Sequence, residues 1–311
     1  MLAVPWFVIR DLDGGTLSQR QIGVAYALTA YGIWGVLPLY LKALQAVPAL
    51  EVEAHRIVWA ALLLLLLVAV TGQWGWLRQV RERPRLAWLF VASAAGLSIN
   101  WLTYIWAVNV DRVVDASLGY FINPLFSVVL GVLVLKERLR VGQWAAVALA
   151  SAGVLWLTVQ AGQPPWIGLT LAVSFGLYGL FRKTASIDAL GGLTLETWLL
   201  LPLAGGYLLY LSLTQQSSWA TGGPIQDALL VAAGPITAVP LLAFAAGARR
   251  IPLSLVGILQ YLGPSLQLGL GVLVFHEPLP IEKLFGFALI WAALVVYTIE
   301  GLSFRAPPAS V

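Results

Sequence analysis

The second half of this chain repeats the first. Residues 124–139 return 140 positions later as residues 264–279, and eight of the sixteen positions are identical. A repeat of fixed period decides the architecture, because each copy forms one structural unit. If each copy crosses a membrane an odd number of times, the two copies must lie upside down relative to each other.

The composition indicates a membrane protein. The chain is 60% hydrophobic and 10% charged, whereas soluble domains average about 25% charged residues. Charged residues are also excluded in blocks, each long enough for a helix to span about 30 Å of hydrocarbon with roughly 20 residues. The charge-free blocks are 22–41, 57–77, 86–110, 116–135, 228–248 and 251–275.

The remaining spans complete a set of ten helices. The stretch 141–181 is long enough for two spans, which a polar turn at 160–165 separates. Two further spans cover about 193–213 and about 284–301. Strands of a membrane barrel would alternate polar and apolar residues, and these runs do not. The sequence therefore predicts an all-α integral membrane protein of ten transmembrane helices, built as two inverted five-helix repeats.

We expect four segments along the chain. They are a cytoplasmic N-terminal extension (1–21), a first repeat (22–160), a second repeat (166–302) and a cytoplasmic tail (303–311). The extension lacks a long apolar core, so it is not predicted to be a cleaved signal. We interpret the basic loop 78–85 as a segment that fixes the orientation of the chain in the membrane. The alternative is a patch that contacts anionic lipid.

Cationic residues gather in alternate loops. With the N-terminus inside, the inner segments hold fourteen Lys and Arg residues and the outer segments hold three. This positive-inside bias predicts that both termini are cytoplasmic. The inner residues are Arg10, Arg20, Arg78, Arg81, Arg83, Arg85, Lys136, Arg138, Arg140, Arg182, Lys183, Arg249, Arg250 and Arg305, and the outer ones are Lys42, Arg112 and Lys283.

Several classes of function find no support in the sequence. The chain has no cysteine and only two histidines, so no thiolate or histidine metal site is predicted. The net charge of +4 predicts no nucleic-acid partner, because the cationic residues gather in particular loops. No nucleotide-binding motif is present, and no cofactor is predicted. An intramembrane enzyme would need an acid, a base or metal ligands clustered on facing helices, and this sequence predicts no such cluster. We therefore expect no catalytic residue and no enzyme.

Arg56 heads the list of candidate functional residues. The segment 51–56 carries Glu51, Glu53, His55 and Arg56, and helical spacing lets Glu51 meet His55 and Glu53 meet Arg56. An intramembrane charge is by default a functional candidate. The alternative is an interfacial arginine that extends to the lipid headgroups. We expect Arg56 to bind an anionic group of a substrate.

Two carboxylates are candidates for gating or proton coupling, together with His55. Glu196 follows Glu53 by 143 positions, so in an inverted pair Glu53 would face outward and Glu196 inward. A partly buried carboxylate near each gate suits proton coupling. The alternative for Glu196 is a carboxylate that favours a helix N-terminus through the macrodipole.

Two prolines occupy equivalent places in the repeats. Pro124 and Pro264 lie inside apolar spans, and each removes a helical donor and frees the carbonyl four residues earlier, on Tyr120 and Gln260. Broken helices at membrane depth tend to face a cavity. We expect both prolines to shape gates, and Tyr120, Asn123 and Gln260 to bind substrate. A kink used only for packing is the alternative.

Mid-membrane aromatic residues next to amides suggest a substrate pocket. Aromatic side chains at membrane ends usually form interfacial belts, but these lie nearer the centre of their spans. The candidates are Trp34, Asn100, Trp101, Tyr104 and Tyr178, of which Trp34 and Tyr178 are 144 positions apart.

The segment Asp115–Pro124, together with Trp34-Gly35, His55-Arg56, Asn100-Trp101, 105–109 and 260–264, resembles RarD-type proteins of the EamA group in the drug/metabolite transporter superfamily. The resemblance covers about 22–301. It implies ten helices in two inverted repeats, a central cavity, and export across the bacterial inner membrane. Tyr261, which belongs to the segment 260–264, is a further candidate for substrate binding.

The sequence thus predicts a multi-pass secondary transporter that exports small metabolites or drugs by alternating access, with proton coupling as an option. The alternative is an importer or facilitator with the same fold, and an intramembrane enzyme is a remote alternative. The expected partners are a small-molecule substrate and the lipid bilayer. The sequence leaves the oligomeric state open, with a monomer as one option.

Overall fold

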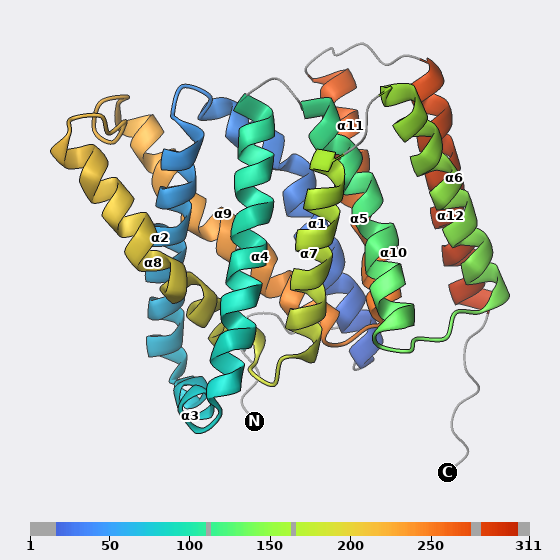
Figure 1. Cartoon of the computed structure of the whole chain (residues 1–311), viewed down its shortest axis with the longest axis horizontal. Coiled ribbons are helices and arrows are strands. Elements are labelled where there is room, and N and C mark those ends of the chain that lie inside the picture. Colours follow the sequence, from blue (N-terminus) through green and yellow to red (C-terminus); the bar gives the residue numbers. More distant parts are fainter. Residues whose placement is uncertain (1–16, 110–112, 163–165, 275–280, 304–311) are drawn as a thin grey trace.

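The computed structural model describes residues 17–109, 113–162, 166–274 and 281–303, and every element of secondary structure in these ranges is a helix. Helices such as α4, α5, α6 and α7 stand upright side by side, whereas α8 and α9 run at a slant to them (Figure 1). They are α1 (Gln19–Ala43), α2 (Ala49–Thr71), α3 (Gly75–Glu82), α4 (Pro84–Asn109), α5 (Val113–Leu133), α6 (Val141–Ala161), α7 (Trp166–Thr184), α8 (Ala189–Leu213), α9 (Pro224–Ala248), α10 (Leu253–Gln260), α11 (Leu262–Leu273) and α12 (Ile281–Ser303).

The helices begin where local chemistry satisfies their first backbone donors. Ser18 and Gln21 form a capping box at the start of α1, in which each side chain accepts a hydrogen bond from the backbone of the other residue. The Asp188 carboxylate accepts a hydrogen bond from the Gly191 N–H at 2.9 Å and caps α8. The short helix α3 carries an exposed ion pair between Arg78 and Glu82.

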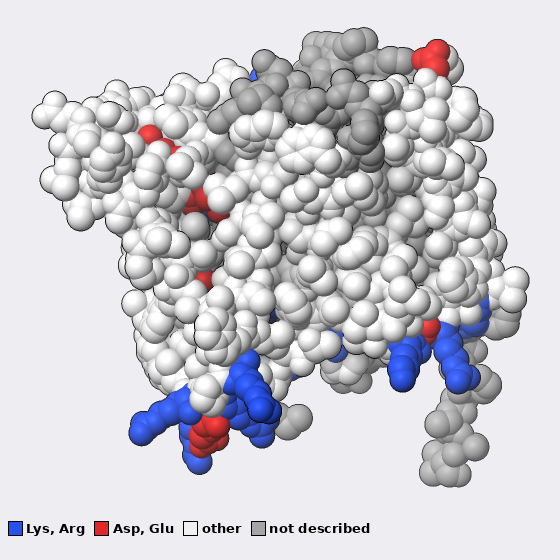
Figure 2. Space-filling model, viewed as in Figure 1, with Lys and Arg blue, Asp and Glu red and all other residues white. Residues whose placement is uncertain are grey.

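The expected all-helical membrane fold is confirmed in a coarse form. Within the described ranges, seven helical segments are long and apolar enough to cross a membrane. Most of the predicted extension 1–21 and nearly all of the tail 303–311 lie outside the described residues. Lys and Arg side chains gather along one rim, where Figure 1 places α3 and the α5–α6 connection (Figure 2).

Packing between the two halves of the chain follows the internal repeat. If α1, α2, α4, α5 and α6 correspond to α7, α8, α9, α10–α11 and α12, the main contacts between the halves have counterparts. Helix α1 packs on α9 as α4 packs on α7, and α1 packs on α10 and α11 as α7 packs on α5. Helix α2 packs on α9 more extensively than α8 packs on α4, and three further large interfaces, α2 with α8, α5 with α10 and α6 with α12, join corresponding helices.

Glycine allows the closest of these contacts. A Cβ atom on Gly234 of α9 would lie 2.6 Å from the Trp59 carbonyl carbon of α2, and one on Gly257 of α10 would lie 2.6 Å from the Pro124 carbonyl oxygen of α5. Small residues let helix backbones approach each other in membranes. The α5–α10 seam is therefore tight beside the first of the two repeated prolines.

The two prolines sit in different backbone settings. Helix α5 runs through Pro124 without a break in its helical assignment, whereas the corresponding span is divided at Tyr261 into α10 and α11. The Tyr261 N–H bonds to the Ile258 carbonyl at 3.2 Å in a tightened last turn of α10. Pro264 then lies in the first turn of α11, where its missing N–H costs least. The two prolines were expected to form equivalent kinks, but one lies in a continuous helix and the other in a broken one.

Candidate functional site

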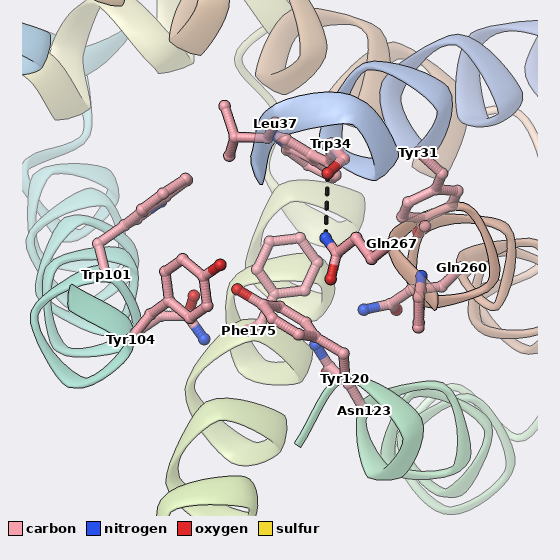
Figure 3. Close-up of a pocket in the computed structure, with 13 residues that line it drawn as sticks. Tyr31, Trp34, Leu37, Trp101, Tyr104, Tyr120, Asn123, Phe175, Gln260 and Gln267 are labelled. Carbon is pink, nitrogen blue, oxygen red and sulfur yellow. Dashed lines mark hydrogen bonds between the residues drawn. The ribbon is translucent and has the colours of Figure 1, made fainter. Parts of the chain in front are cut away.

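A central cavity lies among α1, α4, α5, α7 and the α10–α11 span (Figure 3). Its free space of about 550 Å³ outside the protein atoms includes open solvent. Both halves of the chain supply its wall. The lining residues are Tyr31, Trp34, Leu37, Asn100, Trp101, Tyr104, Tyr120, Asn123, Phe175, Gln260, Gly263, Pro264 and Gln267.

Aromatic rings form most of the wall of the central cavity. Trp34 meets Phe175 edge to face at 5.6 Å between ring centres. Tyr104 meets Tyr120 in the same way at 5.4 Å. Such edge-to-face pairs hold rings in fixed orientations, so these walls offer preformed surfaces to a flat or apolar ligand.

Amide groups supply the polar part of the wall. The Asn100 side chain is held by hydrogen bonds to the Leu171 carbonyl at 2.9 Å and the Ser174 hydroxyl at 3.1 Å. Gln267 donates to the Trp34 carbonyl at 3.0 Å (Figure 3). The buried oxygens Asn123 Oδ1 and Gln260 Oε1, in contrast, have no hydrogen-bond partner among the described residues. Buried acceptors of this kind are costly unless a donor satisfies them.

Eight of the sequence-predicted site residues line the central cavity. They are Trp34, Asn100, Trp101, Tyr104, Tyr120, Asn123, Gln260 and Pro264. The lining residues carry no charge, so the wall selects by shape, stacking and hydrogen bonding.

Two predicted aromatic residues and one proline lie behind the wall instead. The ring of Tyr178 is fully buried and stacks on Phe244 at 5.8 Å, because Phe175, one turn earlier on α7, occupies the wall. Tyr261, at the break between α10 and α11, is also fully buried and donates to the Phe121 carbonyl at 3.3 Å. Pro124 is buried with its carbonyl against Gly257.

Three of the predicted residues, Glu53, Arg56 and Glu196, line a second cavity among α2, α4, α8 and α9, whose free space of about 360 Å³ outside the protein atoms includes open solvent. Its polar lining residues are Glu53, Arg56, Ser98, Glu196, Thr197 and Thr237, and its apolar ones are Ile57, Ala60, Leu97, Leu193, Leu200 and Leu241. Glu53 and Glu196 therefore face one shared space. This arrangement differs from the expected separation of the two carboxylates between an outer and an inner gate.

The two carboxylates of the second cavity are each paired with an arginine. Arg56 Nη2 donates to Glu53 Oε1 at 3.2 Å. Glu196 Oε1 accepts from the Ser93 hydroxyl at 2.5 Å and lies 3.7 Å from Arg182 Nη1. Because Asp188 caps α8 and Glu196 is buried two turns further on, the macrodipole account does not describe Glu196.

Arg56 links the two cavities. Its guanidinium carbon lies 3.4 Å from the centre of the Trp101 ring, and Trp101 lines the central cavity. The side chain is buried rather than extended to the membrane surface. The structure therefore places Arg56 behind the aromatic wall, in contact with Trp101. Its expected contact with an anionic group of a substrate stays a prediction.

His55 belongs to a separate cluster at the start of α2. Its Nδ1 accepts from Trp59 Nε1 at 3.2 Å, and its ring stacks on Trp219 at 5.3 Å. Glu51 Oε1 accepts from the Ser217 hydroxyl and the Ser218 N–H of the α8–α9 connection. Glu51 and His55 thus use different hydrogen-bond partners, and together they hold that connection onto α2.

Sequence reasoning missed five lining residues of the central cavity and three polar lining residues of the second cavity. The former are Tyr31, Leu37, Phe175, Gly263 and Gln267, and the latter are Ser98, Thr197 and Thr237. Tyr31 and Phe175 are 144 positions apart, the spacing already noted for Trp34 and Tyr178. Extending that spacing by one helical turn would have found both.

Comparisons with known proteins agree with this architecture. Residues 21–159 match the model of the EamA-like transporter family. The chain is 46% identical to Protein RarD of Streptomyces exfoliatus, over 92% of this chain and 90% of the relative. It is 48% identical to an uncharacterized transporter of Pseudomonas aeruginosa, over 92% and 95% of the two chains.

A solved structure shows the same fold. The crystal structure of another protein superposes on this chain with a TM-score of 0.69, and the match covers 92% of this chain and 100% of the other. The two sequences are 22% identical, so the likeness concerns the fold alone.

Proposed function

Because the chain belongs to the EamA-like transporter family as a RarD-type permease, we propose that it exports small metabolites or drugs across the bacterial inner membrane by alternating access. The protein is a multi-pass membrane transporter. The direction of transport, the class of substrate and the inverted arrangement of ten spans are our proposal.

The single observation that carries the proposal is the position of the central cavity at the seam of the two halves. Tyr120 and Gln260 are 140 positions apart, Tyr31 and Phe175 are 144 apart, and all four line this cavity. If the halves are inverted, rocking one against the other exposes the same wall first to one side of the membrane and then to the other.

The inverted ten-span arrangement rests on the paired contacts of the helices. Counting α10 and α11 as one span and leaving α3 outside the bilayer gives ten crossings. The basic rim then faces the cytoplasm by the positive-inside rule. Both termini are cytoplasmic in this arrangement.

The wall of the central cavity points to a class of substrate. Its aromatic faces favour a flat or apolar body, and the free oxygens of Asn123 and Gln260 favour N–H or O–H donors on the substrate. Without a charged residue in the lining, the cavity suits a neutral or weakly charged amphipathic molecule better than the anion that was expected to bind Arg56.

Transport in oriented vesicles tests this proposal. Inside-out vesicles from overexpressing cells should accumulate aromatic metabolites or drugs from a panel, and vesicles that carry Asn123→Leu should not. Accumulation only in right-side-out vesicles would favour the importer or facilitator. Absence of transport for the whole panel in both orientations would overturn the proposal.

A further inference from the structure

The second cavity is built from groups whose hydrogen-bonding capacity is not used up. The atoms Glu53 Oε2, Arg56 Nε, Arg56 Nη1, Ser98 Oγ, Glu196 Oε2 and Thr237 Oγ1 are buried and have no hydrogen-bond partner among the described residues. All of these residues line the same space. A buried carboxylate oxygen without a donor is unfavourable, so this set indicates a ligand that supplies donors.

The two carboxylates are arranged alike. In each, Oε1 has a partner in the protein and Oε2 has none. Glu53 is 6% exposed and Glu196 is 1% exposed. Because the residues are 143 positions apart, they stand at corresponding places of the internal repeat. A site with a carboxylate from each half is suited to a ligand that both halves handle in turn.

The groups that face these carboxylates come from five other helices. Arg56 lies beside Glu53 on α2, and Tyr40 of α1 and Tyr120 of α5 interact electrostatically with Arg56. Arg182 and Tyr178 of α7 act on Glu196, and Ser93 of α4 donates to it. Thr237 of α9 faces the same space. Two arginines thus balance two carboxylates, and protonation of either carboxylate would leave a surplus cation.

We propose that the second cavity is a proton-binding site of the transporter, in which water joins Glu53 to Glu196 and either carboxylate takes up the proton at Oε2. The neutral acid then becomes an O–H donor, and the hydroxyls of Ser98 and Thr237 are acceptors in reach of the shared space. The proton comes from a hydronium ion in this water, whose O–H bond breaks as the carboxylic O–H bond forms, and a neutral water molecule is left. This proton-binding step deepens the proposed function, on which it rests.

Arg56 carries the effect to the central cavity. When Glu53 is ionised, its carboxylate forms an ion pair with the Arg56 guanidinium, which also stacks on the Trp101 ring at 3.4 Å. When Glu53 is protonated, the ion pair is lost and only the stacking contact remains. The position of Trp101 in the wall of the central cavity therefore depends on the proton, and substrate binding in turn affects proton binding.

Infrared pH titration of the purified protein tests the site without any substrate. The wild type should show the carbonyl band of a neutral, buried carboxylic acid growing as the pH falls. Glu53→Gln and Glu196→Gln should each remove part of this band, and Glu53→Asp should retain it. Glu300→Gln is the matched control, because Glu300 is a buried carboxylate paired with Arg140 outside both cavities.

A second measurement reads the coupling to the central cavity. The chain has no cysteine, so the alkylation rate of Leu37→Cys in the central cavity can be followed against pH. Alkylation of any thiol speeds up with pH, because the thiolate is the nucleophile. Beyond that common dependence, we expect a pH-dependent component that Glu53→Gln removes and Glu300→Gln leaves unchanged. If the band and the alkylation rate respond equally in all variants, no proton binds in the second cavity. That result would overturn the proton-binding site and leave transport through the central cavity standing. If the infrared band titrates as expected but the vesicles show no transport, the proposed function alone is overturned.

Discussion

The guanidinium of Arg56 lies 3.4 Å above the ring of Trp101, so a cation stands directly behind the aromatic wall of the central cavity. A cation over an indole face is stabilised by about 0.5–2 kcal/mol, with the larger values at desolvated sites. The same guanidinium is paired with Glu53 at 3.2 Å. One side chain thereby connects a carboxylate of the second cavity to a wall residue of the first.

Removing one member of the Arg56–Glu53 pair should destabilise the protein more than removing both charges. Arg56→Met leaves a buried carboxylate unpaired, and breaking such a pair costs about 3–5 kcal/mol. The double variant Arg56→Met with Glu53→Gln should recover most of this loss. Thermal unfolding in detergent measures the four stabilities of the wild type, Arg56→Met, Glu53→Gln and the double variant. Additive losses in the double variant would show that the two charges do not depend on each other.

Substitution of the free amide oxygens should lower transport without loss of folding. Asn123→Leu and Gln260→Leu remove acceptors that no protein donor in the described ranges satisfies, so the folded state loses no hydrogen bond at these oxygens while substrate loses about 1–2 kcal/mol of binding. Gln143→Leu is the control, since Gln143 donates to Tyr297 away from both cavities. Initial transport rates should fall for the first two variants and stay normal for the control.

Glu137 should stabilise the junction between the two halves. Its carboxylate oxygens accept from the Leu253 N–H at 2.7 Å and the Ser254 N–H at 3.0 Å, at the start of α10. Charge-assisted bonds to a helix N-terminus are strong, and Glu137→Ala should lower the free energy of unfolding by about 1–3 kcal/mol. Glu82→Ala, which removes an exposed partner of Arg78, should cost less than about 1 kcal/mol. Equal losses in the two variants would argue against a structural junction.

The proposed topology makes opposite predictions for two connections. Reporter fusions after Arg140 should report a cytoplasmic location and fusions after Gln163 an external one, because the basic α5–α6 connection stays inside. Activity assays of an enzyme that folds only outside the cytoplasm distinguish the two sites. The same signal at both fusions would show that α6 does not cross the membrane and would contradict the inverted ten-span arrangement.

The sequence predicted the all-helical membrane fold, but not how individual side chains are grouped around the two cavities. Charge-free blocks report which segments enter the membrane, and repeat spacing brought Tyr120 and Gln260 to one cavity. The sequence could not show that Phe175 rather than Tyr178 faces that cavity, because the rotation of α7 about its axis depends on packing against Phe244. Nor could it place Glu53 and Glu196 in one space, since their distance depends on how α2 crosses α8.

The broken span shows another limit of sequence reasoning. Pro124 and Pro264 look equivalent in the repeat, but only the second span is divided, at Tyr261. The residues around each proline differ, with Asn123 before the first and Gly263 before the second. Two copies that follow the same plan can therefore differ at the point where substrate is expected to bind.

Labelling of one central residue from both sides of the membrane tests alternating access most directly. Asn123→Cys, in this cysteine-free chain, would carry the reactive group in the wall of the central cavity. A membrane-impermeant thiol reagent should label it in right-side-out and in inside-out vesicles, while Leu203→Cys, on an exposed side chain of α8, should stay unlabelled in the lipid. Labelling of Asn123→Cys from both sides is the predicted result, and labelling from one side only, under all conditions of pH, would contradict alternating access through this cavity.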